Sequence, residues 1–248
     1  MQHALKQSFD IVDNCELVHG LLEQCLAREQ VAMPRLPDMA RCLLPMMAED
    51  ATRAEQLADV ISAMMWRSKL LDIPGQQRKA KNLWRHALAT AQWSRHVSRL
   101  LGREAETGYL CGMLHNIGKV VTLAAVQVLA QRSYVRLSGE ECDRLIETFH
   151  RHIGMQVGAL WQMPAVVQSV ITQWEAYGSA GSARVECNIV NLAHQLSDYT
   201  LMDSTLLARD LIIVDSVYTD LGFSKRDGAA LFDISASIDA SLERYPVD

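Results

Sequence analysis

Gly112-Met113-Leu114-His115-Asn116-Ile117-Gly118-Lys119 is the most informative stretch of this 248-residue sequence. A histidine and a short polar side chain stand side by side among glycines and aliphatic residues. Neutral imidazole is the commonest metal ligand that proteins offer. Asn116 has no anionic oxygen to help hold a divalent cation, as an aspartate would have at this step. The octapeptide therefore offers one histidine as a metal ligand and no carboxylate beside it.

The composition predicts a soluble chain that does not bind nucleic acid. At 248 residues it can form one large domain or two small ones. The net charge of −5 argues against a nucleic-acid surface, which usually has a basic excess. We interpret the short basic cluster Arg78-Lys79-Lys81 as a solvated helix start. No stretch approaches the roughly 18 uninterrupted apolar residues of a membrane span.

The cysteines predict a reducing compartment. The six residues are scattered, and no two form a Cys-x-x-Cys pair. This usage is typical of buried thiols and not of a disulfide framework. The N-terminus has polar residues among its apolar ones and does not read as a signal peptide. We therefore expect a cytoplasmic protein.

Residue usage predicts helix nearly throughout, because helix formers dominate and no run of alternating β-branched residues occurs. The first expected helices cover residues 4–29, 38–47 and 53–71. Ile73-Pro74-Gly75 is the clearest break. It predicts an N-terminal helical bundle over residues 1–75 and a second helical domain over 76–248, or one continuous compact unit.

Beyond the break, several helix boundaries are marked by capping residues. Gly102 stands where a helix C-terminus favours glycine. Ser138 and Glu141 form a capping box, and Pro164 suits a first helical turn. Ser224 with Asp227 predicts one more helix start. The expected helices are 79–101, 104–129, one that starts at the Ser138 capping box and ends near 162, 164–177, 183–200 and 204–221.

Four histidines lie where they can converge: His86, His115, His150 and His194. His86 shares a helical stripe with Leu83, Thr90, Trp93 and Val97, and His150 shares one with Ile146, Ile153, Val157 and Trp161. A single inward histidine is more often a core residue than a ligand. Several on separate helices favour a metal site. Asp198, one turn beyond His194, and Glu175 are the stray carboxylates nearby in sequence.

Three stretches together carry a family resemblance. They are Leu83-Trp84-Arg85-His86-Ala87, the segment from Tyr109 to Lys119, and the spacing His150-x3-Gly154-x3-Gly158-x2-Trp161-x2-Pro164. The combination resembles the HDOD domain, a bacterial relative of the HD and HD-GYP phosphohydrolases that has lost much of their metal-ligand set. The likeness covers roughly residues 33–200. It implies an all-α fold, with an HD-like helical core preceded by an N-terminal helical bundle.

The departures from the hydrolase pattern bear on activity. Asn116 and His194 stand where the hydrolases have aspartates. Trp174-Glu175 stands where many relatives have two histidines. The resemblance thus implies a signalling module without general catalytic activity.

We therefore expect a non-catalytic regulatory module of bacterial signal transduction that binds a signalling protein or a small ligand. Its candidate pocket residues are His86, His115, Asn116, Lys119, His150 and His194. No cofactor is expected, apart from a divalent metal at low occupancy. The alternative is a metal-dependent phosphohydrolase with a rearranged ligand set of His86, His115, His150 and His194. A third possibility is a dimerisation unit that uses the first helix or residues 206–217, and a homodimer is compatible with all three.

Overall fold

A computed structural model describes residues 70–132, 134, 136–201 and 206–247, together with the isolated positions Gly20, Gln24 and Met65. Within these residues all regular secondary structure is helical, as the sequence predicts. The expected helices over 4–29, 38–47 and 53–71 lie almost wholly outside the described residues, and so does most of the expected N-terminal bundle. The division at residue 75 stays a prediction.

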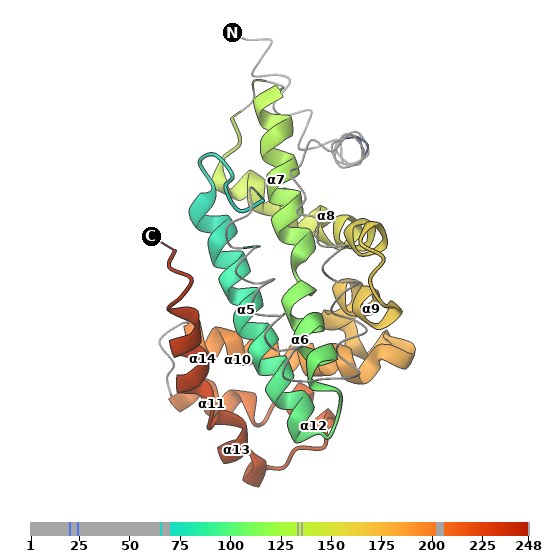
Figure 1. The fold of residues 1–248 in the computed structure, drawn as a ribbon, viewed down its shortest axis with the longest axis vertical. Coiled ribbons are helices and arrows are strands. Elements are labelled where there is room, and N and C mark those ends of the chain that lie inside the picture. Colours follow the sequence, from blue (N-terminus) through green and yellow to red (C-terminus); the bar gives the residue numbers. More distant parts are fainter. Residues whose placement is uncertain are drawn as a thin grey trace.

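Helix α5 (Gln77–Leu100) is the long central element, and α6, α10 and α14 pack against it (Figure 1). Trp84, Trp93 and Val97 are buried, and because Trp84 lies on the opposite side of the helix from Trp93, α5 is covered on more than one face. Gly102 ends the helix in the left-handed region, at φ +65°. Two backbone bonds, Gly102 N–H to Arg99 O and Arg103 N–H to Ser98 O, complete a Schellman motif. The predicted C-cap is confirmed.

Helices α6 (Ala105–Leu114) and α7 (Ile117–Arg132) replace the single helix expected over 104–129. The break falls at His115-Asn116. The His115 ring donates from Nδ1 to the carbonyl of Gly112 at 2.6 Å. A continuous helix would give that carbonyl to the Asn116 N–H. A side chain that takes a backbone acceptor competes with the helix, so the expectation of one helix was wrong at the motif itself.

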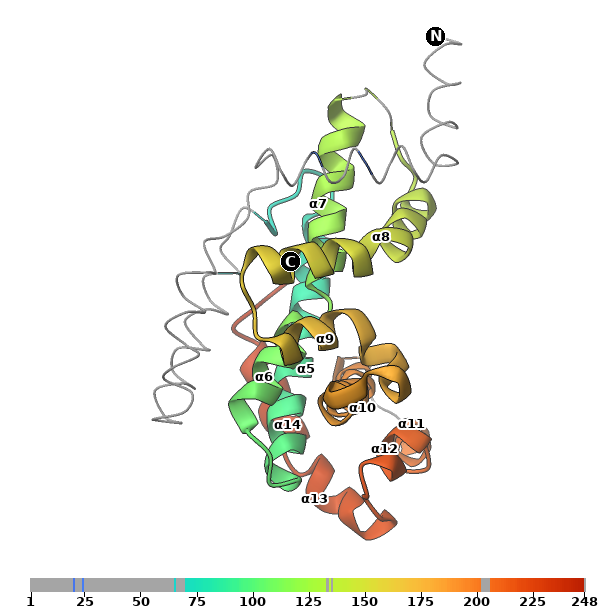
Figure 2. The same cartoon turned by 90° about the vertical axis from the view of Figure 1, so that its right-hand side faces the viewer.

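Helix α8 (Gly139–Leu160) crosses α7 at very close range (Figure 2). Ser138 and Glu141 form the predicted capping box at its start. A methyl group on Gly118 would overlap the carbonyl oxygen of His150, and an ideal Cβ on Gly154 would lie 3.5 Å from the Gly118 Cα. The glycines therefore let two helix backbones meet.

The remaining helices complete the core around α10 (Arg184–Leu201). Helix α9 (Ala165–Gln173) starts with Pro164 as its N-cap, and short 3₁₀ turns η1 (Trp174–Ser179) and η2 (Gly181–Ala183) lead to α10. The expected helix 204–221 is two helices, because the Asp215 side chain caps a new start. Ser224 and Asp227 form the predicted cap, here on a 3₁₀ turn. These C-terminal elements are α11 (Leu206–Ile212), α12 (Ser216–Asp220), η3 (Lys225–Asp227), α13 (Gly228–Phe232) and α14 (Ser235–Leu242).

One stretch among the described residues, Ala105–Arg132, is long and apolar enough to cross a membrane by length and composition. It spans α6 and α7, and most of it is buried inside the fold. A central helix pair of a helical protein has the same character.

Candidate functional site

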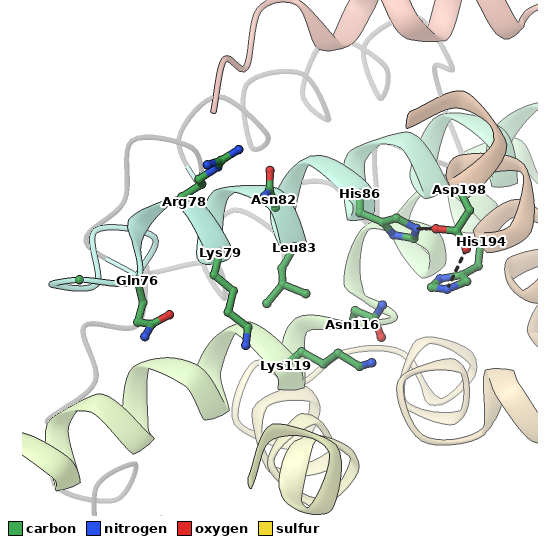
Figure 3. A pocket seen from close by; sticks show the side chains of 11 residues that line it. Gln76, Arg78, Lys79, Asn82, Leu83, His86, Asn116, Lys119, His194 and Asp198 are labelled. Atoms are coloured by element: carbon green, nitrogen blue, oxygen red, sulfur yellow. Dashed lines mark hydrogen bonds and ion pairs between the residues drawn. The ribbon is translucent and has the colours of Figure 1, made fainter. Parts of the chain in front are cut away.

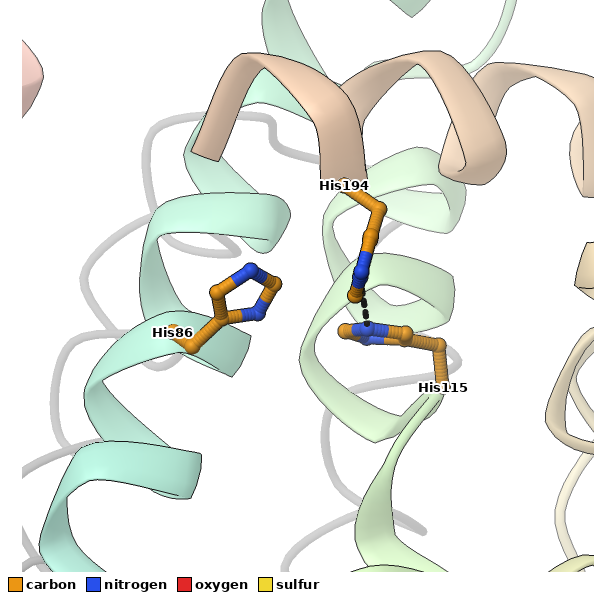
Figure 4. A group of neighbouring side chains, drawn as sticks. All are labelled: His86, His115 and His194. Atoms are coloured by element: carbon orange, nitrogen blue, oxygen red, sulfur yellow. Dashed lines mark hydrogen bonds between the residues drawn. The ribbon is translucent and has the colours of Figure 1, made fainter. Parts of the chain in front are cut away.

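Three histidines converge between α5, the α6–α7 junction and α10 (Figure 4). His86, His115 and His194 each offer a ring nitrogen, and these nitrogens all lie within 4.8 Å of one another. The ring centroids of His86 and His194 are 4.4 Å apart, and those of His115 and His194 are 5.4 Å apart. We call these three residues the histidine cluster.

Hydrogen bonds fix the protons of the cluster. A carbonyl oxygen only accepts, so His115 Nδ1 carries a proton toward Gly112 O and its Nε2 holds a lone pair. That Nε2 lies 3.2 Å from His194 Nδ1, which therefore donates. His86 Nε2 donates to Asp198 Oδ1 at 3.0 Å. The backbone thus orients His115 in the way that outer-shell partners orient metal-binding imidazoles.

Burial keeps the inner rings neutral. Desolvation, followed by the charges of His194 and His86, holds the pKa of His115 well below 6.5. Desolvation also lowers the pKa of His194 to about 4; the charge of His86 acts in the same direction, and Asp198 opposes it. Desolvation opposes ionisation of Asp198, but its bond from His86 and the nearby imidazoles lower its pKa overall. At neutral pH, His115 and His194 therefore offer lone pairs beside an ionised carboxylate.

Asn116 lies at the inner end of a cavity of about 530 Å³. The residue is 5% exposed, and its side-chain Oδ1 has no hydrogen-bond partner among the described residues. A buried acceptor without a partner costs roughly 1–3 kcal/mol. The fold therefore holds an unsatisfied oxygen next to the histidine cluster.

The cavity opens from the histidine cluster along the first turns of α5 (Figure 3). Its wall combines cationic, polar and small residues. The described lining residues are Gly75, Gln76, Arg78, Lys79, Asn82, Leu83, His86, Asn116, Lys119, His194 and Asp198. Lys119 Nζ pairs with Glu147 at 2.8 Å, and Lys79 pairs with Asp143. Asp198 is the one carboxylate in this described lining.

Trp174 closes the cluster on the side of η1. Its ring stands edge-on to His115 at 5.2 Å between centroids and lies 4.5 Å from His194 at an interplanar angle of 36°. The neighbouring Glu175 turns away and pairs with Arg151 on α8. The tryptophan therefore fills the space beside the two imidazoles with an apolar ring.

The family comparison agrees with this architecture. A model of the HDOD domain matches residues 54–177, which is half of the chain. The chain belongs to the HDOD domain family. The matched range contains His86, His115 and His150 but ends before α10. The HDOD match thus does not include His194 or Asp198.

One sequence relative and one solved structure are similar to this HDOD chain. An uncharacterised protein of Treponema pallidum (strain Nichols) is 27% identical over 99 residues, which cover 37% of this chain and 19% of that protein. The chain thus matches about a fifth of that relative's length. The crystal structure of an HDOD domain protein with unknown function from Geobacter sulfurreducens superposes with a TM-score of 0.54 at 15% identity, and the match covers 99% of this chain and 92% of that one. This second likeness shows the shared fold.

His150, the fourth candidate ligand, lies outside the histidine cluster. It is buried as its apolar stripe predicted, but its Nε2 lies 3.6 Å from Glu147 Oε2 on its own helix. The close packing of α8 on Gly118 places it there. Desolvation and then the charge of Lys119 lower the pKa of His150. Among the described residues, the structure brings three of the four expected histidines together.

Sequence reasoning missed part of the site. Arg78 and Lys79, interpreted as a solvated helix start, line the cavity. The signal was present, because positions 79, 83 and 86 lie on one helical face. Asp198 was named only as a stray carboxylate, yet its i, i+4 spacing from His194 places it beside that ring.

The histidine cluster fits one transition-metal ion better than it fits a magnesium ion. In a tetrahedral zinc site with Zn–N distances of about 2.1 Å, two nitrogens lie about 3.4 Å apart. The ring nitrogens here all lie within 4.8 Å of one another, so side-chain rotations that move a ring nitrogen by up to about 1.4 Å would close the set. Three imidazoles suit zinc, copper or nickel, whereas magnesium prefers oxygen ligands.

Proposed function

We propose that this HDOD chain is a regulatory module of bacterial signal transduction that works by binding and does not hydrolyse phosphoesters. The composition of the inner end of the cavity carries the proposal. Asn116 presents an amide where metal-assisted hydrolysis would be served by a carboxylate. Asp198, the one carboxylate in the described lining, is engaged by His86.

The size of the cavity supports the binding of a small ligand as one signal that the module receives. Its volume of about 530 Å³ lies in the range of small-molecule sites. We propose that such a ligand, or a signalling protein bound to the surface, is what the module recognises in the cytoplasm. The net charge of −5 supports a partner other than nucleic acid or a membrane surface. Self-association into a homodimer is compatible with either input and is measured by light scattering.

A phosphoesterase assay tests the non-catalytic role. Purified untagged chain is incubated with bis(4-nitrophenyl) phosphate and with cyclic nucleotides, in the presence of Zn²⁺, Mn²⁺ or Mg²⁺. We expect no turnover above that of His115→Ala prepared in the same way. A rate that depends on His115 would overturn the proposal. His152→Ala, on α8 and outside both the histidine cluster and the cavity lining, is the matched control.

A metal-dependent phosphohydrolase is the second candidate, and the convergence of the histidine cluster favours it. His86, His115 and His194 would hold the ion, with His150 outside the set. A divalent ion held in this way supplies a bound water of lowered pKa. Asp198 is the carboxylate placed to accept a proton at that end of the cavity. The assay above decides between the two candidates.

A further inference from the structure

Three positive side chains line the cavity. Arg78 and Lys79 come from the first turn of α5, and Lys119 comes from α7. The side chain of Lys79 extends from α5 toward α7, where Lys119 lies (Figure 3). Because the chain as a whole has a net charge of −5, a cavity with three cations and one carboxylate in its described lining favours an anionic ligand.

The start of α5 adds to the attraction for an anion. Gln76 is the N-cap residue, but its side chain makes no cap bond, and the first turn of this helix has no acidic residue. The N–H groups of a first helical turn have no partner within the helix, and the helix dipole places positive charge there. Gly75, Gln76 and Lys79 line the cavity, so this end of α5 faces it. A phosphate group suits such N–H groups together with lysine and arginine side chains.

The opposite end of the cavity offers hydrogen-bond acceptors. Asn116 Oδ1 is buried there without a described partner, and an amide oxygen only accepts. Asp198 accepts from His86, and its carboxylate has further acceptor sites. His86 follows Lys79 by two helical turns, so the two ends of the cavity are about 10 Å apart along α5. The part of a ligand that reaches this end therefore needs hydroxyl or amino groups and no negative charge.

We propose that the cavity binds a small phosphomonoester, with its phosphate at the start of α5 and with hydroxyl or amino groups at the end beside the histidine cluster. The ligand class refines the binding role proposed above, on which it rests. Arg78, Lys79 and Lys119 supply the positive charge, and Asn116 Oδ1 and Asp198 accept from the other end. The volume of about 530 Å³ leaves room for a sugar or nucleoside body.

The two lysines connect this site to α8. Lys79 pairs with Asp143, and Lys119 pairs with Glu147 one helical turn further along α8. Both carboxylates are 61% exposed, and ion pairs this exposed are weak. A phosphate group can therefore draw the two amino groups away from α8. Binding then leaves two unpaired carboxylates on the surface of α8, a change that a signalling protein can recognise.

Calorimetric titration of the untagged, chelator-treated full-length chain tests the ligand class. The probes are inorganic phosphate, ribose 5-phosphate, glucosamine 6-phosphate and adenosine monophosphate. We expect at least one ester to bind roughly tenfold more tightly than inorganic phosphate does, and its phosphate-free counterpart to bind at least roughly tenfold more weakly than the ester. If no ester binds more tightly than inorganic phosphate, or if the phosphate-free counterpart binds as well as the ester, the proposal is overturned.

Charge-removing variants test the placement of the phosphate. Arg78→Gln and Lys119→Gln should each weaken binding of the best ester roughly tenfold or more. Lys225→Gln removes the same charge from an exposed position outside the cavity lining, so it is the matched control and should bind as the wild type does. Equal affinity in all three variants would show that the ester binds elsewhere.

The acidic residues on α8 test the link to that helix. The double variant with Asp143→Asn and Glu147→Gln frees both amino groups for the ligand and should bind the best ester several-fold more tightly. Unchanged affinity would overturn the competition between the phosphate and α8.

Chemical acetylation of the wild-type chain, measured by mass spectrometry, does not depend on how the variants fold. The best ester should protect Lys79 and Lys119 and leave Lys225 as reactive as before. Equal labelling with and without the ester would overturn the site. A phosphate-release assay on the same ester separates the ligand class from the proposed function. Binding without release upholds both, binding with release upholds the site but overturns the non-catalytic role, and no binding overturns the ligand class alone.

Discussion

Helix α5 contributes to two buried polar clusters that differ in kind. Toward its C-terminal end, Arg95 donates to Glu106 at 2.7 Å, and both side chains are 4% exposed. The guanidinium also lies 3.9 Å from the centre of the Tyr109 ring. In the histidine cluster, by contrast, the three rings are alike, no counter-charge is fully buried with them, and Asn116 Oδ1 has no described partner.

The contrast separates structural from functional burial of polar groups. In the buried ion pair each charge has its counter-charge inside the protein, and the pair joins α5 to α6. In the histidine cluster, three similar imidazoles lie near an amide oxygen that has no described partner. Buried polar groups of this kind, which can still bind something, are typical of ligand sites. We therefore expect changes at the two clusters to act on different properties of the chain.

The largest effect on stability is expected at the ion pair. Glu106→Gln leaves the buried Arg95 without its counter-charge, and breaking such a pair costs about 3 kcal/mol or more. Denaturant unfolding of the variant measures the loss. Arg151→Met, which breaks the exposed pair with Glu175, should cost less than about 1 kcal/mol.

Measuring the zinc affinity of the Glu106 variants tests whether the ion pair is purely structural. If the pair is purely structural, Glu106→Gln should bind Zn²⁺ as the wild type does, as long as the variant is folded. The double variant with Arg95→Met and Glu106→Leu should recover most of the lost stability, because apolar replacement of a buried pair is often neutral or favourable. A loss of zinc affinity in a folded Glu106→Gln variant would contradict the separation of the two clusters.

The expected dependence of stability on pH comes from the histidine cluster. The folded-state pKa values of His115 and His194 are depressed below the ordinary 6.5, the latter to about 4. Below pH 6.5 the unfolded chain binds more protons than the folded chain, so the free energy of unfolding falls as the pH falls toward 4. Each such histidine contributes about 1.4 kcal/mol per pH unit in this window.

Chelated samples of wild type, His115→Gln and His152→Gln, unfolded at pH 7.5 and pH 5.5, measure this contribution. His115→Gln should lose about 1.4 kcal/mol less on acidification than the wild type. His152→Gln should behave as the wild type does. Parallel losses in all three would show that His115 is not a source of the acid sensitivity.

The local parts of this fold were readable from the sequence. The Ser138–Glu141 capping box and the Gly102 helix end each depend on residues within a few positions of one another. The break at His115 was not readable, because it depends on where one ring hydrogen bond goes. The second break, at Asp215, followed from a side-chain cap that competes with a continuous apolar pattern.

The candidate site was predictable only as far as helical faces allow. The apolar stripes correctly indicated that both His86 and His150 are at least partly buried. Which helices meet is a tertiary property, and α8 meets α7 through Gly118 and thereby takes His150 away from the histidine cluster. The positions of Trp174 beside the imidazoles and of Asn116 Oδ1 without a partner both depend on residues that are distant in the sequence. Neither feature could therefore be predicted from the sequence.

Asn116→Leu should change stability less than Glu106→Gln does, and it is the most direct test of the contrast. Leucine has a similar volume and needs no hydrogen-bond partner, so removing the unsatisfied Oδ1 should raise the free energy of unfolding of the metal-free chain by about 1 kcal/mol. The same variant should bind Zn²⁺ roughly 10- to 100-fold more weakly.

Asn188→Leu is the matched control, because Asn188 Oδ1 is also buried without a described partner but does not line the cavity. It should gain similar stability and keep its zinc affinity. If Asn116→Leu destabilises the metal-free chain, the oxygen has a partner within the fold, and its use by a ligand is excluded.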